Sequence, residues 1–152
     1  IGVPFYLHGE EVLRSKMFHD NSFNLPLCVN ALSYNFTNEQ RAMQDYYRGL
    51  IAFRKKAAEL HLYSKEDVEQ HFQLIDTSDK PLTIAFTIDN LLVVYNASNR
   101  EVSIPSPVSG RYYVYVENDK ACDLAFHEFD ATAGDAIAVG PIRAMVCRRE
   151  DL

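Results

Sequence analysis

Apolar and polar residues change their spacing twice along the chain, and each change marks a different kind of structure. The chain opens with a short apolar run, Val3–Leu7, and turns polar at His8. Such a run predicts a strand, which Pro4 restricts to an edge or start position because proline lacks a backbone donor. Residues 8–36 show little periodicity, which is uncommon in a compact domain unless the segment is functional.

The polar segment gives way to a helical pattern near residue 37. Thr37 or Asn38 is placed to cap the helix, because short polar side chains accept hydrogen bonds from the first free backbone N–H groups. Apolar residues then recur three and four positions apart over 39–60, which predicts an amphipathic helix. Gly49 lies in its middle, where it either marks a close contact between helix and sheet or is merely tolerated.

After this helix the sequence predicts a second, short helix and then a series of β-strands. Ser64, followed by Asp67, caps a short helix that we expect to end near Phe72. From Gln73 onward apolar and polar residues alternate between turn residues, which predicts an antiparallel sandwich or barrel. The seven predicted strands lie within 72–78, 82–88, 91–97, 101–105, 111–117, 135–140 and 143–149.

The strand within 111–117 carries three tyrosines. Its alternation places Tyr112 on the face that also holds the valines at 114 and 116, and places Tyr113 and Tyr115 on the other face. The second face is either a sugar-stacking platform made by Tyr113 and Tyr115 or an aromatic-rich contact with a neighbouring domain. We favour the contact.

The sequence therefore predicts an α+β chain with three parts. Residues 1–62 hold a strand, a long loop and a helix, and residues 63–72 form a linker helix. Residues 73–152 form an all-β antiparallel sandwich.

Charge and composition exclude several classes of function. The net charge of −6, with 15 dispersed basic residues, argues against nucleic acid as a partner, and no apolar run approaches the roughly 20 residues that span a membrane.

The spacing of Cys28, Cys122 and Cys147 is too wide for a disulfide framework or a metal site, so we expect buried free thiols. We expect no cofactor and no metal. The first residue is Ile, so we expect the native start to be missing, and localisation, cytoplasmic or secreted, stays open.

Several stretches have counterparts, in the same order, in one enzyme family. They are GVPFYLHGEEVLRSK at 2–16, DNSFN at 20–24, YYRGLIAFRK at 46–55, YSKEDVEQHF at 63–72, LLVVYNAS at 91–98, GRYYVYVENDKA at 110–121 and AIAVGPIRAMVCR at 136–148. Together they resemble the C-terminal end of a type I pullulanase, a debranching enzyme of the α-amylase superfamily (glycoside hydrolase family 13). The resemblance implies a C-terminal fragment: the strand–loop–helix remnant of a (β/α)8 barrel, followed by the β-sandwich.

In that family the loop after the last barrel strand lines the cleft that holds the α-glucan. The resemblance therefore nominates substrate-side or loop-ordering residues: Glu11, Arg14, Asn21, Ser22, Phe23 and Asn24. Amide and carboxylate groups satisfy sugar hydroxyls, and an aromatic ring stacks on a sugar face. The sequence also departs from the family. Phe23 stands where a tyrosine is usual, Leu27 and Ser33 stand where the family has aspartates, and Tyr34 stands where it has a tryptophan.

The resemblance nominates no catalytic residue in this chain. Retaining glycosidases need two carboxylates about 5 Å apart, and in this family those groups lie on earlier barrel strands. Glu10 and Glu11 are adjacent, so on a strand they would face opposite ways. His19-Asp20-Asn21 resembles a sugar-binding motif of amylases but stands in the wrong place, after the glutamate pair. We expect no hydrolysis by this chain alone.

Two hypotheses remain for its role. The first is the tail of an enzyme that cleaves α-1,6 bonds of pullulan, starch or glycogen, supplying one cleft-lining loop and a structural sandwich. The second is a free-standing, non-catalytic carbohydrate-binding or interaction module. Without its barrel domain, the helix at 39–60 is expected to expose an apolar face. That face would be covered by self-association or by the sandwich, or residues 1–36 would be disordered.

Overall fold

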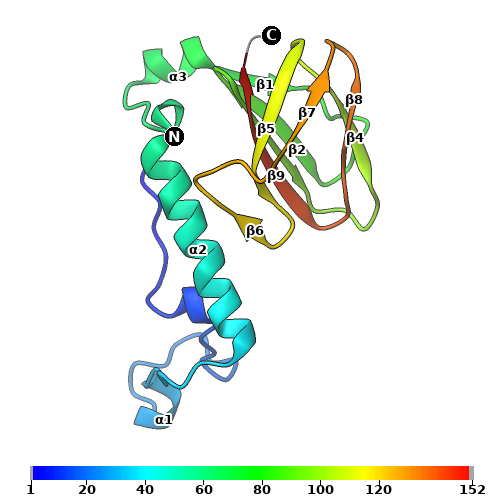
Figure 1. Cartoon of the computed structure of the whole chain (residues 1–152). Coiled ribbons are helices and arrows are strands. Elements are labelled where there is room, and N and C mark those ends of the chain that lie inside the picture. Colours follow the sequence, from blue (N-terminus) through cyan, green and yellow to red (C-terminus); the bar gives the residue numbers. More distant parts are fainter. Residues whose placement is uncertain (1, 151–152) are drawn as a thin grey trace.

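The structure, a computed structural model, describes residues 2–150 and has an α-helical side and a β-sandwich side (Figure 1). Residues 2–36 are mostly irregular. The helices are α1 (Leu27–Asn30), α2 (Asn38–Lys56) and α3 (Lys65–His71), with 3₁₀ turns at Glu10–Val12 and Ala58–Leu60. The predicted α+β class is confirmed.

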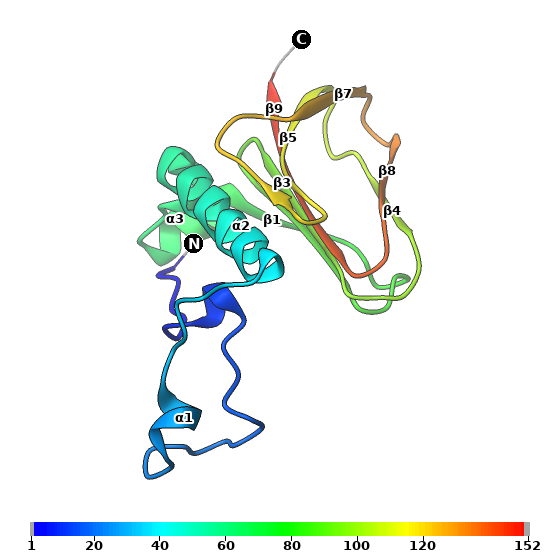
Figure 2. The same cartoon turned by 60° about the horizontal axis from the view of Figure 1, so that its bottom comes forward.

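Two antiparallel sheets make up the sandwich (Figure 2). The larger sheet has the order β1-β2-β3-β9-β5-β6 with β7 paired to β5, and the smaller one pairs β4 with β8. The strands are β1 (Phe72–Ile75), β2 (Thr83–Ile88), β3 (Leu91–Asn96), β4 (Val102–Pro105), β5 (Gly110–Glu117), β6 (Lys120–Ala121), β7 (His127–Ala131), β8 (Ala136–Val139) and β9 (Arg143–Glu150). The seven predicted strands all form. Sequence reasoning missed β6, which has two residues, and β7, whose charged residues hide its alternation.

Buried side chains from both sheets meet in one core. Leu92 of β3 and Val114 of β5, from the large sheet, belong to the same cluster as Ile104 of β4 and Ile137 of β8. Tyr112 is 1% exposed and stacks on the ring of Phe129. The predicted inward face of β5 is therefore confirmed. Burying each large side chain of this kind stabilises the fold by about 1.5–3 kcal/mol.

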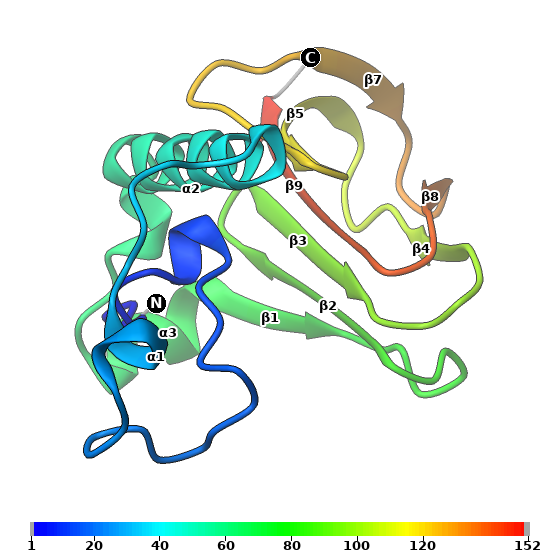
Figure 3. The same cartoon turned by 90° about the horizontal axis from the view of Figure 1, so that it is seen from below.

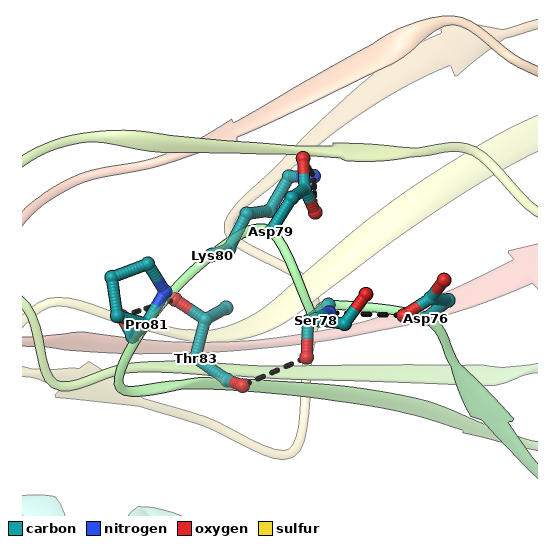
Figure 4. Close-up of polar contacts among 7 residues, drawn as sticks. Asp76, Ser78, Asp79, Lys80, Pro81 and Thr83 are labelled. Atoms are coloured by element: carbon teal, nitrogen blue, oxygen red, sulfur yellow. Dashed lines mark hydrogen bonds and ion pairs between the residues drawn. The ribbon is translucent and has the colours of Figure 1, made fainter.

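The connection from β1 to β2 forms at the predicted turn residues (Figure 4). The backbone N–H of Ser78 donates to Oδ1 of Asp76 at 2.9 Å, and this bond helps to hold the pKa of the Asp76 carboxyl below its usual value. Lys80 pairs with the carboxylate of Asp79 at 2.7 Å. These local side-chain bonds satisfy backbone and charged groups that the strands leave free in the turn.

Helix α2 begins at the predicted cap. The hydroxyl of Thr37 accepts from the backbone N–H of Gln40, and the side chain of Gln40 accepts from the backbone N–H of Thr37. The same reciprocal arrangement joins Ser64 and Asp67 at the start of α3. Helix α2 ends at Lys56 rather than near residue 60, because the next residue, Ala57, leaves the helical conformation and is fully buried.

Helix α2 packs against the face of the large sheet that lies away from β4 and β8 (Figure 3). A Cβ atom at Gly49 would lie 1.8 Å from the carbonyl oxygen of Ala121, so glycine is required for this close approach. Of the two readings of Gly49 left open by the sequence, the structure supports the close contact between helix and sheet. Farther along, the ring of Phe53 lies 5.0 Å from that of Tyr115, and Lys56 pairs with Asp123 at 2.6 Å.

The predicted strand over Val3–Leu7 is not formed. A strand needs a neighbour that satisfies its backbone N–H and C=O groups, and no strand of the described residues runs beside this segment. Val3 and Phe5 are each 93% exposed. The carbonyl of Gly2 instead accepts from Arg54 of α2 at 2.6 Å.

Exposed apolar side chains gather on the N-terminal segment more than on the helix. In α2 the one large exposed apolar side chain is Ile51, at 39%. The exposed apolar residues of the segment are Val3, Phe5, Tyr6, Leu7, Leu13, Met17, Phe18, Phe23, Leu27 and Tyr34. The sandwich therefore covers much of the apolar face of the helix, which was one of the expected outcomes. Self-association through the helix stays a prediction.

Candidate functional site

The side chain of Asn30 organises the loop of residues 16–30. Its amide nitrogen donates to the carbonyls of Ser22 and Leu25, at 2.7 and 3.1 Å. Its amide oxygen accepts from Nζ of Lys16 at 2.8 Å and from the hydroxyl of Ser22 at 2.9 Å. These four bonds use the donors and acceptors of one amide almost completely, so Asn30 holds the turns of the loop together.

Sequence reasoning placed Ser22 in this loop but missed Lys16 and Asn30. The hydroxyl of Ser22 accepts from Lys16 at 3.0 Å as well as donating to Asn30. Ser22 is therefore a loop-ordering residue. Nothing in the spacing of Asn30 distinguished it from the other asparagines of this turn-rich segment, because its partners Lys16 and Ser22 lie 14 and 8 positions away.

Arg14 joins the first part of the loop to its end. Its guanidinium donates to the carbonyl of His8 at 3.2 Å and to the carbonyl of Asn30. The side chain lies across Gly9, where an added Cβ would come within 2.6 Å of it and where φ is +102°. The Nε–H of Arg14 is buried and has no hydrogen-bond partner among residues 2–150. Arg14 is thus fixed in place with one donor still unsatisfied.

Glu11 shapes a turn. Its carboxylate accepts from the backbone N–H of Gly9 at 2.9 Å. The neighbouring Glu10 accepts from the backbone N–H of Leu7 at 3.1 Å. The turn they form is tied to α2, because the side chain of Gln40 donates to the carbonyl of Val12, which is fully buried.

A cavity of about 470 Å³ opens on this loop. Of the six predicted residues, Arg14, Asn21, Ser22 and Phe23 line it, whereas Glu11 and Asn24 do not. The remaining lining residues are Leu7, His8, Glu10, Lys16, His19, Asp20 and Asn30. Phe23 is 83% exposed, so its ring is available to a ligand. Most of the lining side chains are polar, and they include both acidic and basic residues.

The two tyrosines proposed to stack on sugar lie on the outer face of β5. Tyr115 contacts Phe53 of α2, and the guanidinium of Arg148 lies 5.6 Å from its ring. This arrangement matches the alternative reading of an aromatic contact. Tyr113 lies on the same face and is half-buried. Sugar stacking by Tyr113 and Tyr115 stays a prediction.

Residues 2–150 hold no group of three or more His, Cys, Asp or Glu placed to bind a metal ion. No helix among them is long and apolar enough to cross a membrane.

Known proteins resemble parts of this sequence. No family model matches it. The isoamylase of Pseudomonas amyloderamosa is 37% identical over 54 residues, which is 36% of this chain and 7% of the isoamylase. The pullulanase of Bacillus subtilis strain 168 is 30% identical over 74 residues, which is 49% of this chain and 10% of that pullulanase. The chain therefore spans a tenth or less of the curated relatives it matches.

Solved structures match almost the whole chain. A pullulanase from Bacillus acidopullulyticus superposes with a TM-score of 0.84 at 22% identity, over 97% of this chain and 18% of that one. The type I pullulanase of Bacillus subtilis strain 168, complexed with maltose, gives 0.82 at 22% identity, over 99% and 21%. The chain has the fold of the C-terminal part of a pullulanase.

A third pullulanase carries the same fold. The enzyme from Anoxybacillus sp. LM18-11, complexed with maltotetraose, superposes with a TM-score of 0.81 at 23% identity, over 98% of this chain and 21% of that one. Because these matches span both the loop and the sandwich, the pullulanase-like fold includes the segment of residues 2–36. The predicted resemblance to pullulanases is confirmed.

Proposed function

We propose that this chain is the C-terminal part of an α-glucan debranching enzyme of the pullulanase type, acting on α-1,6 bonds of pullulan, starch or glycogen. The observation that carries the proposal is the superposition of almost the whole chain on pullulanases. The sequence likeness to an isoamylase and a pullulanase supports it independently. Two pullulanases with this fold are complexed with maltotetraose and maltose, and the glucan is the substrate that we propose for the complete enzyme.

In this proposal the loop of residues 8–30 forms one wall of the substrate cleft. Arg14, Asn21, Ser22 and Phe23 line its cavity, and the exposed ring of Phe23 stacks on a sugar while Asn21 bonds hydroxyls. Glu11 and Asn24 lie beside the cavity, and Glu11 orders the turn at Gly9.

The sandwich has a structural role in the same proposal. We divide the chain into a barrel-derived part (1–62), a linker helix (63–72) and the sandwich (73–152). The sandwich holds α2 through Gly49, Phe53 and Lys56. The exposed apolar side chains of residues 3–34 then face the barrel domain. No catalytic residue is assigned to this chain, so hydrolysis requires that barrel.

A chimera tests the proposal. This chain replaces the corresponding segment of the Bacillus subtilis pullulanase, and hydrolysis of pullulan is measured. We expect a folded chimera that releases reducing sugar, whereas the isolated chain releases none. In a matched control, the chimera keeps the host's own loop in place of residues 8–30. A folded, inactive chimera whose control is also inactive would contradict the proposal.

The alternative is a free-standing carbohydrate-binding or interaction module. The argument in its favour is that the resemblance nominates no residue of this chain for the catalytic carboxylate pair. This alternative predicts that the chimera has no activity, whereas the first proposal predicts an active chimera. The two readings therefore differ in the same assay.

A further inference from the structure

A second cavity lies between α2 and one end of the large sheet, and it shares no lining residue with the cavity of the loop. Its volume is about 570 Å³, within the roughly 300–1,000 Å³ typical of small-molecule sites. We call it the helix–sheet groove. Its walls are Glu39, Ala42, Met43 and Tyr46 of α2, Tyr95 and Asn96 of β3 with Ala97, Asn118 and Asp119 before β6, and Ile142, Arg143 and Ala144 at the start of β9.

The groove is held open by contacts that fix α2 on the sheet. Gly49 lies directly against Ala121, and Phe53 packs on Tyr115. Farther along, the guanidinium of Arg148 forms a two-pronged pair with the carboxylate of Glu59, at 3.0 and 3.1 Å. A ligand therefore meets a preformed site and does not need to order it, which lowers the free-energy cost of binding.

Two tyrosines give the groove aromatic surface. Tyr95 is 48% exposed, and Tyr46 faces it from the helix and is half-buried. Burial of Tyr46, with a smaller effect of the nearby Tyr95, raises the pKa of the Tyr46 phenol, so this hydroxyl stays neutral. Rings of this kind offer flat apolar faces with a polar end.

The rim of the groove carries free hydrogen-bonding groups. Within residues 2–150, the side chains of Glu39, Asn118, Asp119 and Arg143 make no hydrogen bond or ion pair. The polar groups of the loop cavity are, by contrast, largely bonded to one another, as around Asn30. Two carboxylates and one guanidinium on the same rim disfavour a strongly charged ligand. A neutral ligand with many hydroxyls matches both the rings and the mixed donors and acceptors.

We propose that the helix–sheet groove binds a short α-glucan, with Tyr46 and Tyr95 as the stacking surface and Glu39, Asp119 and Arg143 as partners of the sugar hydroxyls. The choice of an α-glucan rests on the function proposed above. The groove would hold a substrate chain at a point separate from the loop that lines the cleft, and would raise the local concentration of glucan near the enzyme.

The test is titration of the full chain with maltotetraose, followed by the backbone amide shifts in heteronuclear NMR. We expect saturable shifts at Glu39–Tyr46 and Tyr95–Ala97. The substitution Tyr95→Ala is expected to weaken this binding at least fivefold. The matched control is Tyr63→Ala, since Tyr63 is 88% exposed and lies outside the groove, and it is expected to leave the affinity unchanged.

A second variant keeps the test valid if Tyr95→Ala does not fold. Arg143→Ala removes an exposed side chain of the rim and is expected to weaken binding at least twofold. The proposal is overturned by an absence of saturable shifts in the groove, by affinity unchanged in both groove variants, or by equal affinity for cellotetraose. Hydrolysis of pullulan by the chimera is measured independently of this titration. A groove that does not bind glucan can therefore be distinguished from a wrong proposed function.

Discussion

The sandwich and the N-terminal segment are built in opposite ways. In the sandwich, apolar side chains of two sheets face one another, and Leu92, Val114 and Ile104 are at most 1% exposed. In residues 2–36, most large apolar side chains are exposed, although Val12 and Val29 are buried, and order rests on polar bonds around Asn30 and Arg14. The sandwich therefore contains its own source of stability, whereas the segment presents an apolar surface that suits a partner.

Truncation of a leucine in each region gives the largest expected contrast. Leu92→Ala leaves a cavity in the core and is expected to lower the free energy of unfolding by about 2–5 kcal/mol. Leu27→Ala removes a side chain that is 79% exposed and is expected to change it by less than about 0.5 kcal/mol. Urea unfolding followed by circular dichroism measures both. Equal effects would mean that the two regions share one core.

Substitution at Gly49 tests how the helix is joined to the sandwich. Gly49→Ala would gain about 1 kcal/mol of helix propensity in an exposed helix. Here the added methyl meets the carbonyl of Ala121, so we expect a net loss of about 1–3 kcal/mol in thermal unfolding. Lys55→Ala, at an exposed position of the same helix, is the control and is expected to be nearly neutral. A stabilised Gly49→Ala variant would show that the helix does not pack as described.

Alkaline pH is expected to weaken the sandwich through a buried thiol. Burial raises the pKa of Cys147 from 9.0 to about 12. The unfolded chain therefore loses this proton first, and stability is lost as pH rises from about 9 toward 12, by at most about 1.4 kcal/mol per pH unit. Urea unfolding at pH 8 and pH 10 is compared in the wild type and in Cys147→Ala. The variant should show the shallower pH dependence. Cys28→Ala, at an exposed cysteine, should match the wild type.

The smallest effect on global stability is expected from substitution of Asn30, which organises the loop of residues 16–30. Asn30→Ala removes four hydrogen bonds of the loop, so the amides of residues 16–30 should exchange with solvent faster. The unfolding midpoint of the sandwich should change little. Asn24→Ala is the control, because the exposed side chain of Asn24 makes no hydrogen bond among the described residues. A lowered midpoint in the Asn30→Ala variant would contradict the separation of the two regions.

Most helices and strands could be predicted from the sequence because local patterns specify them. The caps at Thr37 and Ser64 and the alternation around Tyr112 follow from neighbouring residues, whereas the close contact of Gly49 is with the distant Ala121. The strand over Val3–Leu7 failed because pairing depends on a neighbour, which no local pattern supplies.

The candidate site was harder to predict than the elements. The loop residues nominated by resemblance do gather at one cavity, with Glu11 and Asn24 outside it. Asn30 and Lys16 were missed because their roles depend on bonds between residues far apart in sequence. The helix–sheet groove joins α2, β3 and β9, so the side chains of its walls come together only in the folded chain.

The most direct test of the account is amide hydrogen exchange, measured on the isolated chain and on the chimera with the pullulanase barrel. The account predicts that residues 72–150 are protected equally in both proteins. It predicts that residues 2–30 exchange faster in the isolated chain than in the chimera, where the barrel covers their exposed apolar side chains. Equal protection of residues 2–30 in the two proteins would contradict it.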